Sequence, residues 1–206
     1  MNVFREWIAE DKQNILYRLN QTIFAEAWDK YAKGSISAWE MEVLCFYYHD
    51  HELIDVNVGK YGLADFSALP EDPVIDRTFW KGDKEIKLFK LSKICGTCIA
   101  KDKTKSTATL LTTSGVVTVK FRKEYFALFD KQISERYADG TKKIVEKSWF
   151  NRGNMILVQG MRSGDNFIAK KYASSGGHQL YKINDIIDGD LALQAERYQG
   201  GFVEDE

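Results

Sequence analysis

The sequence has few prolines and cysteines, almost no net charge and no long hydrophobic run. Its 206 residues include 2 prolines and 3 cysteines, and the formal net charge is −1. An odd number of cysteines is typical of reduced thiols rather than a disulfide framework, which favours a cytoplasmic protein. No apolar run reaches about 18 residues, so we expect no membrane span. The first residues, MNVFREWIAEDK, lack the apolar core of a secretion signal.

The sequence also lacks the compact motifs of common active sites. No Ser-His-Asp order, phosphate-binding glycine loop or paired-carboxylate motif stands out. Cys95 and Cys98 form a CxxC, but it lies in an expected strand, where residues three apart point to opposite faces. Cys45, His49 and His51 lie near each other without a fourth ligand. We therefore expect no catalytic residue, no metal site and no cofactor, and we expect this chain alone not to be an enzyme.

Charge is nearly balanced in total but unevenly distributed along the chain. Residues 1–85 carry 9 Lys and Arg against 16 Asp and Glu, residues 86–182 carry 19 against 7, and residues 183–206 carry 1 against 7. The net charges of the three segments are −7, +12 and −6. A basic segment with aromatics is typical of nucleic-acid binding, whereas acidic flanks folded back onto it would give an ordinary neutralised surface. We favour the binding of a polyanion.

The basic segment has the element order of a small β-barrel. The expected strands, each rich in β-forming residues, are 91–100, 106–112, 116–121, 154–161 and 166–172. Phe126, Phe129 and Ile133 recur at helical spacing after the third strand. Gly160 predicts the bulge or bend that a closing barrel needs. Three strands, a helix and two strands is the order of the oligonucleotide-binding (OB) fold, although a split sheet or a small sandwich also fits the strand count.

The flanking segments complete an α+β protein. Residues 1–55 have helical periodicity, with a capping box at Ser37 and Glu40 and a second helix that runs to about Asp55, and this predicts a small helical subdomain. Residues 56–85 hold both prolines and many acids, and we interpret them as an irregular connecting segment. The five-stranded OB-fold barrel with its one internal helix is expected at 86–185. An acidic, loose C-terminal tail is expected at 186–206.

Two stretches resemble the alpha subunit of bacterial DNA polymerase III. In WEMEVLCFYYHDHELID, the aromatic pair Phe46 and Tyr47, followed by His51 and Leu53, matches the helical signature before the barrel of that family, although Asp-His-Glu stands where the family has Gly-His-Pro. The barrel segment matches that subunit's order of a strand with a glycine, a lysine-rich turn, a strand, a glycine turn, and a strand that ends in phenylalanine with an aromatic residue after it. The matching positions are Gly96, Lys103, Lys105, Gly115, Phe121 and Tyr125. Both signatures come in the family's order and spacing, over roughly residues 38–185.

The resemblance implies a carboxy-terminal region of a bacterial or phage polymerase III alpha subunit, with helices followed by the OB-fold domain. That family's polymerase chemistry uses acidic residues clustered in a palm domain, and no such cluster occurs here. The implied function is non-catalytic binding of single-stranded template DNA during DNA replication, in the cytoplasm. Two alternatives stay open, namely a protein–protein module that docks other replisome subunits and a stand-alone single-stranded DNA-binding protein.

Binding of a single strand requires cations that follow the phosphates and aromatic faces on which bases stack. We expect these from the first turn, the third strand, a polar excursion at 137–153 and the last strand. The candidate nucleic-acid-binding residues are Lys101, Lys103, Lys105, Thr118, Lys120, Arg122, Trp149, Arg152, Lys170 and Tyr172. Phe121 shares a face with Val117 and Val119, so we assign it to the core. Trp149 fits core packing and base stacking equally well.

Overall fold

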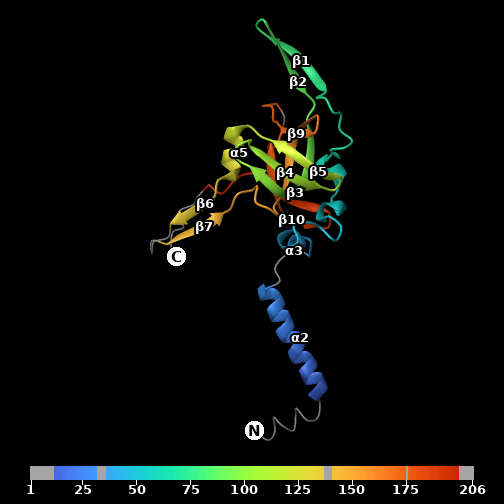
Figure 1. The fold of residues 1–206 in the computed structure, drawn as a ribbon, viewed down its shortest axis with the longest axis vertical. Coiled ribbons are helices and arrows are strands. Elements are labelled where there is room, and N and C mark those ends of the chain that lie inside the picture. Colours follow the sequence, from blue (N-terminus) through green and yellow to red (C-terminus); the bar gives the residue numbers. More distant parts are fainter. Residues whose placement is uncertain (1–11, 32–35, 137–140, 175, 200–206) are drawn as a thin grey trace.

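The computed structural model describes residues 12–31, 36–136, 141–174 and 176–199. A β-barrel forms its centre, α2 extends away from the barrel at one end, and a long hairpin extends at the other (Figure 1). The helical elements are α2 (Lys12–Tyr31), α3 (Ile36–Val43), the 3-10 turn η1 (Glu52–Asp55), α4 (Val58–Tyr61) and α5 (Lys123–Asp130). The strands are β1 (Ile75–Lys81), β2 (Lys84–Phe89), β3 (Ser92–Asp102), β4 (Thr107–Thr112), β5 (Gly115–Lys120), β6 (Ile133–Arg136), β7 (Lys142–Glu146), β8 (Met155–Ser163), β9 (Asn166–Ala169), β10 (Leu180–Ile187) and β11 (Asp190–Gln194).

Five of these strands close the barrel. β3, β4 and β5 are successive antiparallel neighbours, and β5 pairs in parallel with β9. β8 pairs antiparallel with both β9 and β3, which completes the ring in the order β3-β4-β5-β9-β8. α5 lies between β5 and β8 in the sequence, and β10 and β11 extend the sheet beyond β8. The prediction of an α+β protein built on a five-stranded OB-fold barrel is confirmed.

Alternate side chains of the barrel strands fill its interior. The inward residues of the five strands are Ile94, Cys98, Ala108, Leu110, Val117, Val119, Ile156, Val158, Phe167 and Ala169. Phe126 and Phe129 of α5 join the same core, and the Phe121 ring lies 6.1 Å from that of Phe126. Phe121 is therefore a core residue, as its shared face with Val117 predicts.

Gly160 is the residue at which β8 pairs with both of its neighbours in the barrel, β3 and β9. It pairs with Ser92 on β3 and with Ala169 on β9, and the register is continuous through both pairings. A Cβ atom at this position would lie 2.1 Å from the carbonyl oxygen of Ile168 and 2.8 Å from the ring of Phe167. The close approach of two backbones thus requires glycine at this position, and neither pairing contains a bulge there.

Replacing Gly160 by alanine is expected to lower the free energy of unfolding by about 1–3 kcal/mol. The obstructing atom belongs to the Ile168 backbone, so it cannot rotate away from an added methyl group. Urea unfolding followed by far-ultraviolet circular dichroism measures the change. Gly176→Ala is the matched control, because nothing lies within 4 Å of its Cβ position. Equal midpoints for the two variants would contradict this explanation of Gly160.

Two hairpins occupy segments in which we expected irregular chain. The segment 56–85 contains α4 and β1, and β1 pairs with β2 around a turn at Gly82, whose φ of 62° favours glycine. The polar excursion at 137–153 contains β7, which pairs with β6. Every residue of β1 is exposed, so its sequence lacks the apolar–polar alternation of a half-buried strand.

The chain on either side of the barrel also differs from expectation. α3 ends at Val43 rather than near Asp55, and the Glu40 carboxylate then accepts hydrogen bonds from the backbone amides of Tyr48 and His49. The stretch 186–199 of the expected loose tail contains the end of β10 and all of β11, while 200–206 lies outside the described residues. No described helix is both long and apolar enough to cross a membrane.

Candidate nucleic-acid interface

The outward face of β3, β4 and β5 is the surface on which OB folds bind their ligands. Cross-strand pairing aligns Asp102, Thr107 and Lys120 in one row across this face. Thr118 lies in the neighbouring row, opposite Thr109 of β4. Because the intervening residues of β5 point into the core, Thr118 and Lys120 face outward together.

Four cations gather at one end of this face, and we call Lys103, Lys105, Lys120 and Arg122 the basic rim. The β3–β4 turn carries the first two, and it is joined to the end of β5 by the Phe121 amide, which donates to the Ser106 carbonyl at 3.0 Å. The side chains of Lys103 and Lys105 are 72% and 78% exposed. Lys120 and Arg122 are also exposed. Tertiary structure thus brings together four cations from two strand ends.

Nearby carboxylates neutralise the basic rim only in part. Lys103 Nζ lies 3.1 Å from Asp130 Oδ2, and Lys105 Nζ lies 3.9 Å from Asp102 Oδ2. Within the described part of the chain, Lys120 and Arg122 form no ion pair. The Lys105–Asp102 pair is exposed on both sides and contributes at most about 1 kcal/mol, so a phosphate group can replace this carboxylate as partner. The Asp130 side chain is only 9% exposed, whereas the Lys103 side chain that reaches it is 72% exposed.

Lys101 differs from the lysines of the basic rim because its ammonium group is held by several side chains of the protein. Its ammonium group donates to Asp130 Oδ1 at 2.5 Å and to Ser148 Oγ at 3.1 Å. Burial raises the pKa of Asp130, but hydrogen bonds from Lys101, Ser148 and Lys103 outweigh burial and leave this pKa below its usual value. Lys101 therefore joins β3 to the end of α5, and its charge is already matched by a carboxylate.

Trp149 is not available for stacking, which contradicts its assignment as a nucleic-acid contact. Its side chain is 0% exposed, and its ring lies 4.6 Å from that of Phe129. The indole Nε1 donates to Glu146 Oε1 at 2.7 Å, and the Trp149 amide donates to the Phe129 carbonyl. The excursion at 137–153 thus folds back onto α5. The polar residues Lys147 and Ser148, which precede Trp149 in the sequence, do not indicate that Trp149 is buried.

The remaining candidate residues are bound to other parts of the chain. Arg152 Nε donates to the Ile99 carbonyl at 3.1 Å, and Arg152 Nη1 lies 2.9 Å from Cys45 Sγ. The Tyr172 hydroxyl accepts a hydrogen bond from the Phe89 amide at 2.8 Å, and Lys170 Nζ lies 5.1 Å from the centre of each of these two rings. Lys170 and Tyr172 thus connect β9 to the β1–β2 hairpin.

Residues before the barrel cover the other end of the outward face, which the sequence did not predict. The Tyr47 hydroxyl lies 2.8 Å from Thr97 Oγ1, and His51 Nε2 lies 3.0 Å from the Leu111 carbonyl oxygen. His51 Nδ1 accepts from the Leu53 amide, so Nε2 carries the proton and donates to that carbonyl. Burial lowers the pKa of His51, which favours the neutral ring. Tyr47 and His51 of the helical signature therefore dock onto β3 and β4, whereas Phe46 is exposed, and the rim end stays open.

Cys95 and Cys98 lie on opposite sides of β3, as strand geometry predicts. Cys98 is in the barrel core, whereas Cys95 packs with the cluster that includes Ile183 of β10. Burial raises the pKa of both thiols to about 12. Among the described residues, no group of three His, Cys, Asp or Glu side chains is arranged to hold a metal ion.

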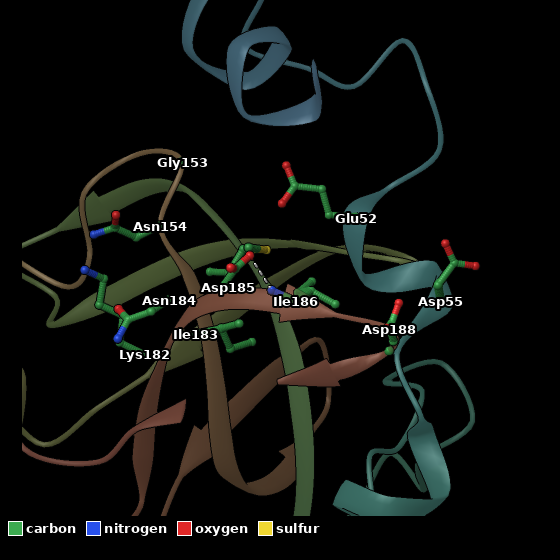
Figure 2. Close-up of a pocket in the computed structure, with 12 residues that line it drawn as sticks. Glu52, Asp55, Gly153, Asn154, Lys182, Ile183, Asn184, Asp185, Ile186 and Asp188 are labelled. Carbon is green, nitrogen blue, oxygen red and sulfur yellow. Dashed lines mark hydrogen bonds between the residues drawn. The ribbon is translucent and has the colours of Figure 1, made fainter. Parts of the chain in front are cut away.

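A second surface feature is an open hollow of about 1010 Å³ beside β10. Figure 2 shows Glu52 and Asp55 of η1 on one side of the hollow, with Asp188, which follows β10, close to Asp55 and with Asp185 of β10 further across. Lys182 is the single cation among the described residues that line it. An excess of carboxylates repels phosphates, so this hollow is the less suitable surface for DNA.

Comparison with known sequences relates nearly the whole chain to a segment of DNA polymerases. The chain is 40% identical over 201 residues to the probable DNA polymerase YorL of Bacillus subtilis (strain 168), and equally to a DNA-directed DNA polymerase of Bacillus phage SPbeta. Each match covers 96% of this chain but 15% of the relative's length. No family model matches, and no solved structure is significantly similar.

These relatives confirm the resemblance to a DNA polymerase and correct one expectation. We expected the chain not to be an enzyme because it shows no cluster of palm-type acids. The proteins that match it along nearly its whole length are named as polymerases, which are enzymes. That expectation is therefore contradicted, since a segment without clustered acids can still be part of an enzyme.

Proposed function

Since the chain is homologous to a segment of DNA polymerases, we propose that it binds single-stranded DNA on the outward face of its barrel. The basic rim is the observation that carries this proposal. In it, Lys103, Lys105, Lys120 and Arg122 lie exposed at the open end of the face, beside Thr118. Cations in such positions bind the phosphates of a strand lying across β4 and β5.

A more specific assignment is based on the sequence resemblance to the polymerase III alpha subunit. We propose that the chain is the OB-fold region near the carboxy-terminal end of a polymerase of the polymerase III alpha type, acting in the cytoplasm. Its role there is to hold the single-stranded template near the polymerase. Side-chain contacts to phosphates carry no sequence information, so we expect little preference among DNA sequences.

Replacing Lys120 and Arg122 together by alanine is expected to weaken binding of all single-stranded oligonucleotides alike. Each phosphate contact releases counterions, so the logarithm of affinity falls with the logarithm of salt concentration by about 0.7 per contact. Loss of two contacts should therefore flatten this slope by about 1.4. Fluorescence anisotropy titrations at several salt concentrations measure affinity and slope together.

The matched control for the rim variant is Arg136→Ala with Lys142→Ala. It removes the same number of charges from exposed, paired positions on β6 and β7, in the hairpin that extends away from the barrel (Figure 1). It should therefore leave the salt slope close to that of the unmodified protein. If the rim variant and this control behave alike, or if the unmodified protein shows no binding at low salt, the proposal fails.

A docking role for other replisome proteins is the second candidate, and one observation favours it. α2 extends away from the barrel (Figure 1) and exposes large apolar side chains at Leu16, Leu19, Ile23, Phe24 and Trp28. Exposed apolar surface of this kind is typical of a protein contact. A failure of the DNA titration would leave this role as the better supported one.

A further inference from the structure

The β6–β7 hairpin extends away from the barrel beside α5 (Figure 1) and is rich in cations. Glu146, one of its two described carboxylates, accepts a hydrogen bond from Arg197, and the other, Glu135, accepts one from the Tyr198 hydroxyl. The carboxylates of the hairpin thus have partners in the C-terminal segment. Five exposed cations lie on the two strands and next to them, namely Lys131, Arg136, Lys142, Lys143 and Lys147.

Two of these cations lie directly opposite each other. The register of the hairpin pairs Arg136 of β6 with Lys142 of β7. Like charges in directly opposite positions destabilise a pair of strands. Among the residues that the structure describes, neither of the two forms an ion pair, and the same holds for Lys131 and Lys147. An anion bound between Arg136 and Lys142 removes this repulsion, so the pair indicates an anion site.

Protection of a strand edge is the other role that charged residues have on a two-stranded sheet, because they prevent pairing with another chain. That role does not require two like charges to be opposite each other. The neighbouring pair, Glu135 and Lys143, places opposite charges across the same hairpin. Edge protection therefore accounts for this second pair, but not for Arg136 opposite Lys142.

The composition of the hairpin favours a DNA duplex as the anion. Its two strands contain no aromatic residue, whereas single strands are bound by aromatic faces on which their bases stack. The bases of a duplex stack on each other, and a surface of cations is sufficient to bind its dense phosphates. A two-stranded β-ribbon also fits the width of the major groove.

We propose that the β6–β7 hairpin binds the phosphates of duplex DNA, with Arg136 and Lys142 as its central contacts. The choice of DNA as the anion rests on the proposed function of the barrel, whereas the anion site itself rests on the charges of the hairpin. The chain then has two DNA surfaces, the basic rim for a single strand and the hairpin for a duplex.

The test compares a blunt DNA duplex with an oligothymidylate in fluorescence anisotropy titrations at several salt concentrations. The hairpin variant is Arg136→Ala with Lys142→Ala. Each phosphate contact on a duplex contributes about 0.9 to the salt slope, so this variant should flatten the duplex slope by about 1.8. Between 1 M and 0.1 M salt, that difference amounts to about 60-fold in duplex affinity. Binding of the oligothymidylate should not change, because its site is the basic rim.

Two further variants and one stability measurement serve as controls. Arg136→Lys with Lys142→Arg retains both charges and should retain the duplex slope. Lys12→Ala with Arg18→Ala removes two exposed cations from α2 and should leave both titrations unchanged. The hairpin variant should have a urea midpoint equal to or higher than that of the unmodified protein, because the repulsion is removed. A lower midpoint would contradict the repulsion and overturn the proposal.

The outcomes of the titrations separate this proposal from the function proposed for the barrel. The hairpin proposal is overturned if the hairpin variant retains the duplex slope, or if it binds the duplex and the oligothymidylate with equally weakened affinity. If no duplex binds while the rim variant weakens binding of the oligothymidylate, the hairpin proposal fails and the barrel site stands. If the duplex binds with the expected dependence on Arg136 and Lys142 but the oligothymidylate does not bind, the barrel function fails and the duplex site stands.

Discussion

Replacing Trp149 by alanine is expected to lower the free energy of unfolding by about 3–5 kcal/mol. The indole is fully buried between α5 and the barrel, where its ring packs against Phe129. The substitution removes this packing, leaves a cavity, and removes the hydrogen bond from Nε1 to Glu146. Because Trp149 belongs to the same core as the barrel strands, the whole domain should unfold at lower denaturant concentration.

Urea unfolding of matched tryptophan variants measures this effect. Trp80→Ala is the control, since an exposed tryptophan should change stability by no more than about 0.5 kcal/mol. The urea midpoint should therefore fall strongly for Trp149→Ala and hardly at all for Trp80→Ala. A Trp149→Ala protein with unchanged stability and weakened DNA binding would restore the stacking interpretation and show this burial to be wrong.

Replacing Glu146 by alanine is expected to cost about 3–5 kcal/mol of stability, because it breaks a buried ion pair. The side chains of Glu146 and Arg197 are 10% and 7% exposed, and Arg197 Nε lies 3.0 Å from Glu146 Oε2. Arg197 also donates to the carbonyl oxygens of Leu128 and Lys147, at the end of α5 and after β7. The variant thus leaves a buried guanidinium without its carboxylate and removes the hydrogen bonds that Glu146 accepts from Gln194 and from the Tyr198 amide.

The same carboxylate makes stability depend on pH. Burial raises the pKa of Glu146, but hydrogen bonds from Trp149, Tyr198 and Arg197 outweigh burial and hold this pKa below its usual value of 4.5. Because the pKa of Glu146 is lower in the folded state, the ionised carboxylate stabilises the folded protein. This contribution to the free energy of unfolding is complete above the unfolded-state pKa and is lost as the pH falls through the folded-state pKa.

Urea midpoints between about pH 6 and pH 3 test both statements about Glu146. The unmodified protein should lose stability toward the acid end, and Glu146→Ala should lose less of it there, because this contribution is already absent. Glu196→Ala removes an exposed carboxylate nearby and is the matched control. Parallel pH profiles for the unmodified protein and Glu146→Ala would show that Arg197 is held by other groups.

The sequence alone was sufficient to predict the barrel and to identify the cations of its rim as candidate contacts. Alternation in β5 places Val117 and Val119 inside and Thr118 and Lys120 outside, because successive side chains of a strand point to opposite faces. The turn signals around Gly115 and the helical spacing in α5 complete the element order of an OB fold. These are local properties, and each is visible within about ten residues of sequence.

The tertiary structure alone decided which residues have a free surface. Lys101 and Lys103 are near neighbours in one basic turn and both reach Asp130, yet the Lys101 side chain is 25% exposed and that of Lys103 is 72% exposed. Lys101 is held by Asp130 and Ser148, which follow it by 29 and 47 residues. Trp149 and Trp80 each stand beside a phenylalanine in a largely polar stretch, yet Trp149 is buried and Trp80 is exposed. Periodicity shows which face of an element is apolar, but burial depends on which other elements pack against it. Those contacts join residues far apart in the sequence, and so only the folded chain determines them.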